Sequence, residues 1–277
     1  MVSYLNEEER YWNEEGGNRW IQHIAFLERM LEPLNQLLLD ALKPETSERI
    51  LEIGCGGGPT SALLSARVGT KGSVVALDVS KPLIKYAQQR FSTLPNISFQ
   101  HVDAATGNLG QSPFDAVTSR FGVMFFPEPA HAFRNIRNSL TQSGRLCMMC
   151  WRTAKENPWM TEAASVAYQY VPPPEPVPPG SPGPFSLGEE SHCYNILLQA
   201  GYKNIEFEPV DCVLDMGTAI EAKQWLCSMG PAARALESAD MQTVASIEEA
   251  ILNMLDKHCV NGSIRIAGAL WIISAAA

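Results

Sequence analysis

The chain has 277 residues, of which 45% are hydrophobic, and its formal net charge at pH 7 is -9 with a pI near 5.1. This length and composition allow one globular core. The acidic balance argues against a nucleic-acid ligand, because proteins that bind DNA or RNA usually present a basic face. The start of the chain shows no signal peptide, and no apolar run is long enough to span a bilayer.

The 7 cysteines are scattered and odd in number, which predicts reduced thiols and a cytoplasmic protein. Cys147 and Cys150 form one C-x-x-C inside an apolar strand, where alternation places them on opposite faces. There is no second pair and no nearby histidine with zinc spacing, so we expect core thiols and no metal site.

Residues 1–45 are predicted to be helical, because apolar residues recur there at helical spacing until Pro44. Two tryptophans, Trp12 and Trp20, flank a break expected at Gly16-Gly17. Two interpretations remain open for this segment. It forms either surface helices pinned by aromatic rings or a lid whose rings close over a cofactor.

A glycine-rich turn follows the first apolar strand pattern. Residues 50–60 read ILEIGCGGGPT, which predicts a buried strand, a tight turn and a helix beginning at Pro59. Gly54 permits a backbone angle that side chains disfavour, and Gly56 and Gly58 let a ligand approach the main chain. The strand–turn–helix context favours a cofactor loop over a structural turn.

Such a loop can bind a dinucleotide or S-adenosylmethionine. The dinucleotide fingerprint G-x-G-x-x-G needs a third glycine, but counting from Gly54 that position holds Pro59. The sequence instead reads Glu52-x-Gly54-x-Gly56-x-Gly58. An NAD-dependent oxidoreductase is therefore kept as an alternative and not as the main interpretation.

The next two strand patterns each end in an acid. Asp78 lies about 20 residues beyond the glycines, where a carboxylate can accept hydrogen bonds from ribose hydroxyls. The other role for Asp78, a helix N-cap, suits Ser80 better. We expect Asp103 to accept from an adenine amino group while the Ala104 N–H donates to a ring nitrogen; the alternative for Asp103 is a turn-forming residue.

Strand and helix patterns alternate through the first half of the chain. Such alternation predicts a parallel sheet with helices on both faces and ligands at the carboxyl ends of the strands. The expected strands are 49–53, 73–78, 97–102 and 113–119, with helices at 59–68 and 81–92. The candidates at strand ends are Gly54, Asp78, Asp103 and Ser119.

If the cofactor carries a methyl group, the end of the fourth strand faces the space where a substrate would meet that group. Enzymes that methylate amino groups of nucleic acids carry an Asp/Asn-Pro-Pro-aromatic motif there, whereas this chain has Ser119-Arg120-Phe121-Gly122. Arg120 either binds a carboxylate or forms a surface ion pair. Met124, Phe125 and the lid aromatics are candidates for an apolar pocket, with core packing as the default alternative for Met and Phe, and Phe121 is a further candidate substrate contact.

The second half of the chain is less regular. The proline-rich stretch 171–184 predicts an extended loop beside a substrate cap. The other expected elements are a helix at 129–138, a strand at 144–151, a helix at 189–200 that ends at Gly201, a strand at 205–213, inserted helices at 218–228 and 241–257, and a last strand at 264–275.

With these motifs, the chain resembles the class I S-adenosylmethionine-dependent methyltransferases, in a bacterial small-molecule branch similar to the ubiquinone and menaquinone methyltransferases. The resemblance rests on Trp12-Asn13 to Trp20, residues 50–60, Asp78, Asp103, residues 114–152, Gly201-Tyr202, residues 230–234 and residues 269–272. One departure is Glu190-Ser191-His192, where relatives often have Asp-Pro, which puts substrate contacts from that helix in doubt.

The resemblance implies an α/β Rossmann-like fold with a seven-stranded, mostly parallel sheet, an antiparallel last strand, an N-terminal helical lid and inserted cap helices. The expected parts of this single domain are a lid at 1–45, a cofactor-binding core at 46–155, a proline-rich cap at 156–200 and C-terminal strands with inserted helices at 201–277.

The resemblance also implies direct transfer of a methyl group from S-adenosylmethionine to O, N or C of a small-molecule acceptor, by a monomer or homodimer. The implied cofactor contacts are Trp12, Trp20, Glu52, Gly54, Cys55, Gly56, Thr60, Asp78, Val79, Asp103, Ala104 and Ser119. The implied substrate contacts are Arg120, Phe121 and Met124. If the reaction needs a base, His23 and His192 are the candidates. A non-catalytic binding protein with the same fold is a further alternative.

Overall fold

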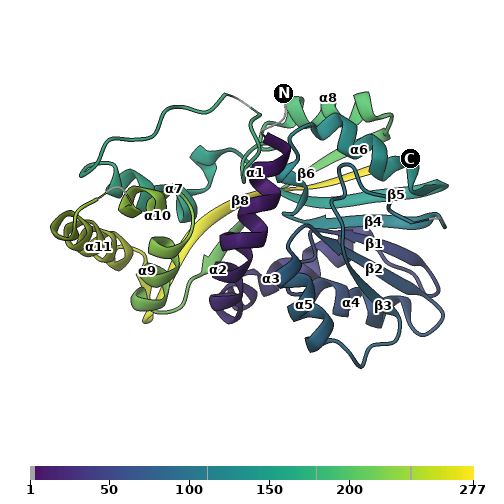
Figure 1. Ribbon diagram of the computed structural model, residues 1–277, viewed down its shortest axis with the longest axis horizontal. Coiled ribbons are helices and arrows are strands. Elements are labelled where there is room, and N and C mark those ends of the chain that lie inside the picture. The colour runs from purple at the N-terminus through teal and green to yellow at the C-terminus, as the bar shows by residue number, and fades with distance from the viewer. Residues whose placement is uncertain (1–3, 111, 179, 238) are drawn as a thin grey trace.

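A computed structural model describes residues 4–110, 112–178, 180–237 and 239–277. Figure 1 shows a sheet flanked by helices on one side of the molecule, a group of helices on the other side, and the N-terminal helices between them. The first three residues of the expected lid, and residue 179 of the proline-rich stretch, lie outside the described residues. Within the described ranges, no helix combines the length and the apolar character needed to cross a bilayer.

The sheet follows the order β3-β2-β1-β4-β5-β8-β6. Neighbouring strands from β3 through β5 pair in parallel, and β8 runs antiparallel to both β5 and β6. A two-residue strand, β7 (Cys259–Val260), pairs with β8. The long strands are β1 (Arg49–Ile53), β2 (Ser73–Asp78), β3 (Ile97–His101), β4 (Phe114–Arg120), β5 (Leu140–Trp151), β6 (Lys203–Asp215) and β8 (Ser263–Ala276). The predicted parallel sheet with an antiparallel last strand is confirmed.

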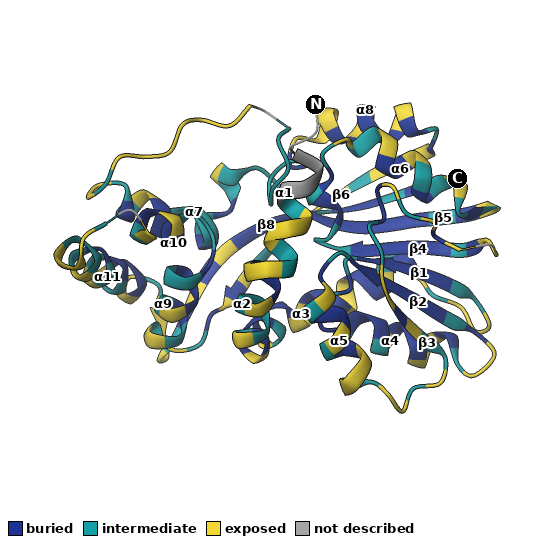
Figure 2. Ribbon diagram, in the orientation of Figure 1, coloured by how far each residue is buried: buried dark blue, intermediate teal, exposed yellow. Residues whose placement is uncertain are grey.

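Helices cover both faces of this sheet, so its central strands are buried on both sides, as Figure 2 shows. This explains why β1, β2 and β4 are nearly continuous apolar runs and do not alternate. One face carries α3 (Ile24–Leu42), α4 (Pro59–Val68) and α5 (Lys81–Arg90), and the other carries α6 (Pro129–Asn138) and α8 (Glu190–Ala200). Ser80 caps α5 and Gly201 ends α8 with a positive φ, both as predicted.

The chain changes direction across the sheet between β1 and β4, which are neighbours at its centre. Ligands of open α/β sheets bind beside such a switch point, at the carboxyl ends of the strands. The ends of β1 and β4 approach closely there, because a Cβ on Gly54 would lie 2.6 Å from the Cα of Gly122. Both positions therefore need glycine.

Helices that follow β5 and β6 form one group, called the cap from here on, which extends beyond the expected cap at 156–200. Figure 1 shows α7 (Pro158–Ala167), α9 (Ala219–Ser228), α10 (Pro231–Glu237) and α11 (Met241–Asp256) grouped beside the long strand β8. Insertion of helices between the last two long strands was predicted and is confirmed. The helices α7 and α10, and the short 3-10 helices η2 (Val123–Phe125) and η3 (Ala154–Glu156), were not predicted.

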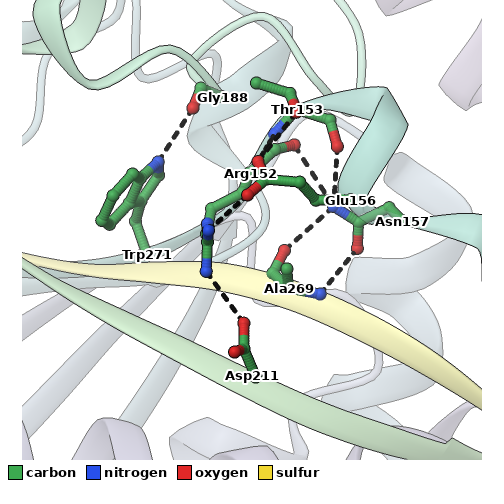
Figure 3. Close-up of polar contacts among 8 residues, drawn as sticks. All are labelled: Arg152, Thr153, Glu156, Asn157, Gly188, Asp211, Ala269 and Trp271. Carbon is green, nitrogen blue, oxygen red and sulfur yellow. Dashed lines mark hydrogen bonds and ion pairs between the residues drawn. The ribbon is translucent and has the colours of Figure 1, made fainter.

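Asn157 joins the cap to the sheet. Its fully buried Nδ2 donates to the carbonyl oxygens of Arg152 (3.3 Å), Thr153 (3.1 Å) and Ala269 (2.9 Å), as Figure 3 shows. Its Oδ1 accepts from the Ala269 N–H at 3.0 Å and from the Trp159 indole at 3.1 Å. One amide thus fixes the end of β5, the start of α7 and the middle of β8.

Arg152 makes a second connection at the same place. Its guanidinium pairs with Asp211 at 2.9 Å and with Glu156, and it lies 5.1 Å from the centre of the Trp271 ring (Figure 3). The Trp271 indole donates to the carbonyl oxygen of Gly188 at 2.8 Å. These contacts tie the loop before α8 to strands β6 and β8.

The N-terminal part comprises α1 (Tyr4–Tyr11), a π-helix η1 (Trp12–Gly16), α2 (Gly17–Gln22) and then α3. The break expected at Gly16-Gly17 is wrong, since both glycines have helical φ angles of -57° and -63°. The interruption comes instead at His23, with φ -105°. A Cβ on Gly17 would collide with the Oγ of Ser80, so the glycine allows the helix to pack closely on the start of α5.

Candidate active site

A cavity of about 230 Å³ lies at the carboxyl ends of β1, β2 and β4, between the sheet and the cap. Residues from every predicted part of the chain line it. The predicted cofactor contacts found in its wall are Trp12, Trp20, Glu52, Gly54, Cys55, Gly56, Thr60, Asp78, Val79, Asp103 and Ala104, and the predicted substrate contacts found there are Arg120, Phe121 and Met124.

The glycine loop presents bare main chain to the cavity at Gly56. Gly54, Gly56 and Gly58 have φ angles of +69°, +55° and +82°. A Cβ on Gly56 would meet nothing within 4 Å, so a ligand has room beside it. The role predicted for Gly58, ligand approach, is replaced by packing, because a Cβ there would lie 2.8 Å from the Phe99 ring.

Asp78 is held rigidly at the cavity wall. Its two carboxylate oxygens accept from the backbone N–H groups of Gly56 and Ser80, each at 2.8 Å. Burial raises the pKa of Asp78, while these two donors and the nearby His101 act in the opposite direction. A carboxylate offers about four acceptor sites, so capacity remains for hydroxyl groups of a ligand.

Glu52 is a buried acid directly below the glycine loop. Its carboxylate accepts a short hydrogen bond from the Ser61 hydroxyl at the start of α4. Burial raises the pKa of Glu52 to about 7, with the Ser61 hydrogen bond and the charge of Arg120 opposing this and the charge of Asp78 adding to it. The Glu52 carboxyl therefore changes its charge near neutral pH.

Arg120 is half-buried and forms no ion pair among the described residues, so the surface ion pair considered for it is not seen. Its Nη1 donates to the Asn35 side-chain oxygen at 2.9 Å and to the Leu31 carbonyl at 3.2 Å. The same Asn35 oxygen accepts from the Thr60 hydroxyl at 3.1 Å. Helix α3 thereby orients a cation and a hydroxyl group at the cavity wall.

Asp103 has the turn-forming role that was its alternative, and its predicted contact with adenine stays a prediction. Its oxygens accept from the Ala105 N–H at 2.8 Å and the Thr106 hydroxyl at 2.9 Å, which makes it a turn-forming residue. Asp103 and Ala104 also line the cavity. The turn fixes the loop that carries both residues.

Ser119 is not part of the cavity wall. Its hydroxyl donates to the Ile53 carbonyl at 2.8 Å and accepts from the Gly122 N–H at 3.2 Å, and the residue is fully buried. It holds the end of β4 to the end of β1. Its place at a strand end was predicted correctly. The predicted cofactor contact is not supported, because the side chain bonds the neighbouring main chain and does not line the cavity.

The structure does not bring the candidate bases to the cavity. His23 contacts the Ser228 hydroxyl at 2.8 Å through Nε2, and burial lowers its pKa. His192 is exposed on α8 beside Gly180. No histidine of the described chain lines the cavity, and the ionisable side chains in its wall are carboxylates, Arg120 and the Cys55 thiol.

A wall of tryptophans forms the cap side of the cavity and was not predicted. Trp151 at the end of β5, Trp159 on α7 and Trp225 on α9 all line the cavity. The Phe121 ring lies parallel to that of Trp151, with 4.1 Å between the ring centroids. The centroids of Trp151 and Trp159 are 4.8 Å apart, and those of the stacked rings of Trp159 and Trp225 are 5.6 Å apart. Phe121 has a φ of +66°, a conformation that bulky residues rarely adopt and that concentrates at functional sites.

The lid presents its aromatic rings to the same cavity. Trp12 packs edge-on against Trp20 at 6.0 Å and against Phe125 at 5.8 Å. The surrounding backbone is a π-helix, an element often found at functional sites. The rings pin these helices to each other and to η2, and they also line the cavity, whereas their closure over a cofactor stays a prediction.

A set of hydrogen bonds fastens the lid to the loop after β2. The Asn13 side chain donates to the Val79 carbonyl at 2.8 Å and accepts from the Lys81 N–H at 3.0 Å. The Ser80 hydroxyl donates to the Trp12 carbonyl at 2.9 Å. The loop held in this way carries Asp78 and Val79, both in the cavity wall.

Comparison with known proteins agrees with this geometry. Residues 50–144 match the family described as "Methyltransferase domain". Aklanonic acid methyltransferase DauC of Streptomyces sp. (strain C5) is 32% identical over 116 residues, which cover 41% of this chain and 53% of that protein. Demethylmenaquinone methyltransferase of Staphylococcus epidermidis is 26% identical over 137 residues, 49% of this chain and 56% of that protein. This chain thus spans about half the length of these curated relatives.

Among solved structures, the YcgJ protein from Bacillus subtilis superposes with a TM-score of 0.58 at 15% identity, covering 87% of this chain and 97% of that protein. At this identity the likeness shows the fold alone. Together the matches confirm the predicted resemblance to the class I methyltransferases and the predicted fold.

Proposed function

We propose that this chain, whose residues 50–144 match a methyltransferase domain, is an S-adenosylmethionine-dependent methyltransferase that acts on a small, uncharged and largely apolar acceptor. The observation that carries the proposal is the single cavity wall that joins the glycine loop, Asp78 and Asp103 to the tryptophans of the cap. One half of the wall suits a cationic nucleoside, and the other half suits an apolar molecule.

The residues at the strand ends fit S-adenosylmethionine. Asp78 would accept from the ribose hydroxyls, and the loop of Asp103 and Ala104 would hold the adenine. The open side of Gly56 gives the cofactor room beside the main chain, and Glu52 and Arg120 supply one acid and one cation for its methionine end. Carboxylates outnumber cations in this wall, which suits the positive sulfonium.

S-adenosylmethionine, when bound, supplies an activated methyl group and leaves as S-adenosylhomocysteine. The residues of this chain contribute by orienting the acceptor and excluding water. Trp12, Trp20 and Phe125 from the lid side, and Trp151 and Trp159 from the cap side, provide apolar surface for both tasks. Because no histidine lines the described cavity, we infer that the acceptor carries a nucleophile that needs no histidine base, whether O, N or C.

The charge and the cysteines of the chain bear on its partners and on the compartment where it works. The net charge of -9 and the acidic cavity wall favour a small molecule over a nucleic acid. The 7 cysteines are free thiols, which suits a reducing compartment such as the cytoplasm. We propose a monomer or homodimer as the working unit.

Thermal-shift measurements with S-adenosylmethionine, S-adenosylhomocysteine and NAD test the cofactor. A ligand at about 100 times its dissociation constant stabilises the folded state by roughly 2.7 kcal/mol. We expect stabilisation by the first two compounds and none by NAD. Stabilisation by NAD alone would overturn the proposal, and no stabilisation by any of the three compounds would favour a non-catalytic protein. Release of S-adenosylhomocysteine, followed over a panel of aromatic alcohols, amines and quinols, then tests the acceptor.

A further inference from the structure

The indole of Trp225 is a buried hydrogen-bond donor without a partner. Trp225 is 6% exposed, lines the cavity and stacks between Phe26 (5.9 Å) and Trp159 (5.6 Å). Its Nε1 atom has no hydrogen-bond partner in the described structure. The neighbouring indole of Trp159, by contrast, donates to Asn157 at 3.1 Å.

An orphaned buried N–H is uncommon, because each such group is costly unless something satisfies it. The ring neighbours of Trp225 are aromatic and offer flat faces. Flat rings prefer partners that are flat, and a buried polar group among them sets orientation and specificity. The missing partner is therefore best sought on the molecule that fills the cap side of the cavity.

We propose that the cap side of the cavity binds a planar, uncharged aromatic acceptor, and that a carbonyl or ether oxygen of this acceptor receives the hydrogen bond of the Trp225 indole. The proposal rests on the proposed function and names the substrate class of the same site. The Nε1 atom is covered by neighbouring atoms, so the contact requires a small shift of α9 as the acceptor enters. Trp225 is in this view a specificity-determining residue.

The test uses binding of simple probes to the full chain saturated with S-adenosylhomocysteine. Chromone is planar and carries a carbonyl, naphthalene has the same size without an oxygen, and 1-naphthoate adds a negative charge. Titration calorimetry gives the dissociation constant of each probe for the native protein and for Trp225→Phe, which keeps an aromatic ring and removes the N–H. Trp159→Phe is the matched control, because it removes an N–H that already has a partner.

We expect Trp225→Phe to weaken chromone binding about tenfold and to change naphthalene binding less than twofold. Trp159→Phe should change both probes to the same extent. We expect 1-naphthoate to bind at least tenfold more weakly than naphthalene, because carboxylates predominate in the wall. An equal loss of both neutral probes in Trp225→Phe, or no loss of either, overturns the role of the indole. Binding of 1-naphthoate as tight as that of naphthalene overturns the uncharged acceptor.

The two proposals fail in different ways. If S-adenosylhomocysteine does not bind, the proposed function fails, whereas if it binds and both neutral probes do not, only the present inference fails. If Trp225→Phe does not fold, ¹⁵N-labelled tryptophan in the native protein replaces it. One indole signal should then move downfield with chromone and not with naphthalene, and identical spectra with the two probes would refute the hydrogen bond.

Discussion

At the scale of single residues, two glycines offer a controlled test of the cofactor loop. Gly56 and Gly262 have φ angles of +55° and +82°, and a Cβ on either would meet nothing within 4 Å. Gly56 lines the cavity, whereas Gly262 lies in the tight turn between β7 and β8. We expect Gly56→Ala to weaken S-adenosylmethionine binding at least tenfold, because the new methyl group occupies ligand space.

Gly262→Ala should leave that affinity within twofold in calorimetric titration. Each variant should lose ~1–2 kcal/mol of stability, because both place a side chain in a left-handed conformation. Equal affinities of the two variants would show that Gly56 does not face the cofactor.

Glu52 makes stability depend on pH. Burial raises its pKa in the folded state to about 7, above the unfolded value of 4.5. The folded state therefore binds the proton more tightly, so the free energy of unfolding contributed by this group is largest below pH 4.5 and is lost as the pH rises to about 7. The full effect is at most ~3 kcal/mol. Denaturant titrations of the native protein and Glu52→Gln at pH 5 and pH 8 measure it as the difference between the two proteins.

The same residue predicts pH-dependent ligand binding. A cationic cofactor favours the ionised carboxylate, so binding releases a proton and the affinity for S-adenosylmethionine should rise between pH 6 and pH 8. Glu52→Gln should flatten this rise when titrations are repeated across the range. A rise of equal size in the variant would assign the effect to another group, such as Asp78.

At the scale of elements, the lid depends on the contacts of Asn13. Its side chain bonds Val79 and Lys81 across the lid boundary and the Glu9 carbonyl within the lid, at 2.8 to 3.0 Å. We expect Asn13→Ala to weaken S-adenosylmethionine binding three- to tenfold, and to speed amide hydrogen exchange over residues 8–22, because the lid opens more often.

Asn18→Ala is the matched control for this prediction. Asn18 makes the same bond to the carbonyl four residues earlier, that of Glu14 at 3.0 Å, but among the described residues its side chain forms no hydrogen bond outside the lid. Its loss should change helix stability slightly and leave cofactor affinity unchanged. Equal effects of the two variants would mean that Asn13 acts only within its helix.

The elements also show where a sequence is informative. Strands β1 and β2 and helices α4 and α6 were predicted with their observed bounds, because apolar runs between Gly and Pro residues mark such elements locally. The site residues at strand ends followed from the topology of a parallel sheet. Asp78 and Asp103 line the cavity because each follows a parallel strand. The prediction did not depend on their hydrogen-bond partners in the loops.

The remaining features depend on contacts that local patterns do not encode. Trp151, Trp159 and Trp225 are 8 and 66 residues apart in sequence order, so their stacking is set by the packing of α7 and α9. Two adjacent glycines locally predict a break at 16 and 17, although close packing on Tyr11 and Ser80 requires them inside helices. The predicted bases His23 and His192 lie on the lid and on α8, but neither lines the cavity.

At the scale of the whole molecule, Asn157 couples the cap to the sheet. Asn157→Leu would remove the acceptor of the Ala269 N–H and of the Trp159 indole and one donor from each of three carbonyl groups, of which those of Thr153 and Ala269 keep a backbone N–H. We expect a loss of ~3 kcal/mol or more in the free energy of unfolding, because buried polar groups lose their hydrogen bonds. Urea titration measures it, and the tryptophan emission should shift as Trp159 is released.

Asn135→Leu serves as the comparison. It also removes two bonds to carbonyl groups, those of Ala104 and Gly107, both at 3.0 Å, but at a distance from the cap. Stability should fall without the change in emission. An unchanged emission in Asn157→Leu would show that α7 holds its place without this amide.

The position of β8 also constrains the order in which the molecule assembles during synthesis. Among the strands that the structure describes, β8 is made last, yet it lies between β5 and β6 and is the one partner of β6 in the sheet. Strands β1 to β4 have all their neighbours before β8 is made, whereas one edge of β5, the whole of β6 and the helices that follow β6 wait for the last strand. Since pairing of distant segments is slow, β6 and the cap remain open to chaperones and proteases until the ribosome has delivered β8.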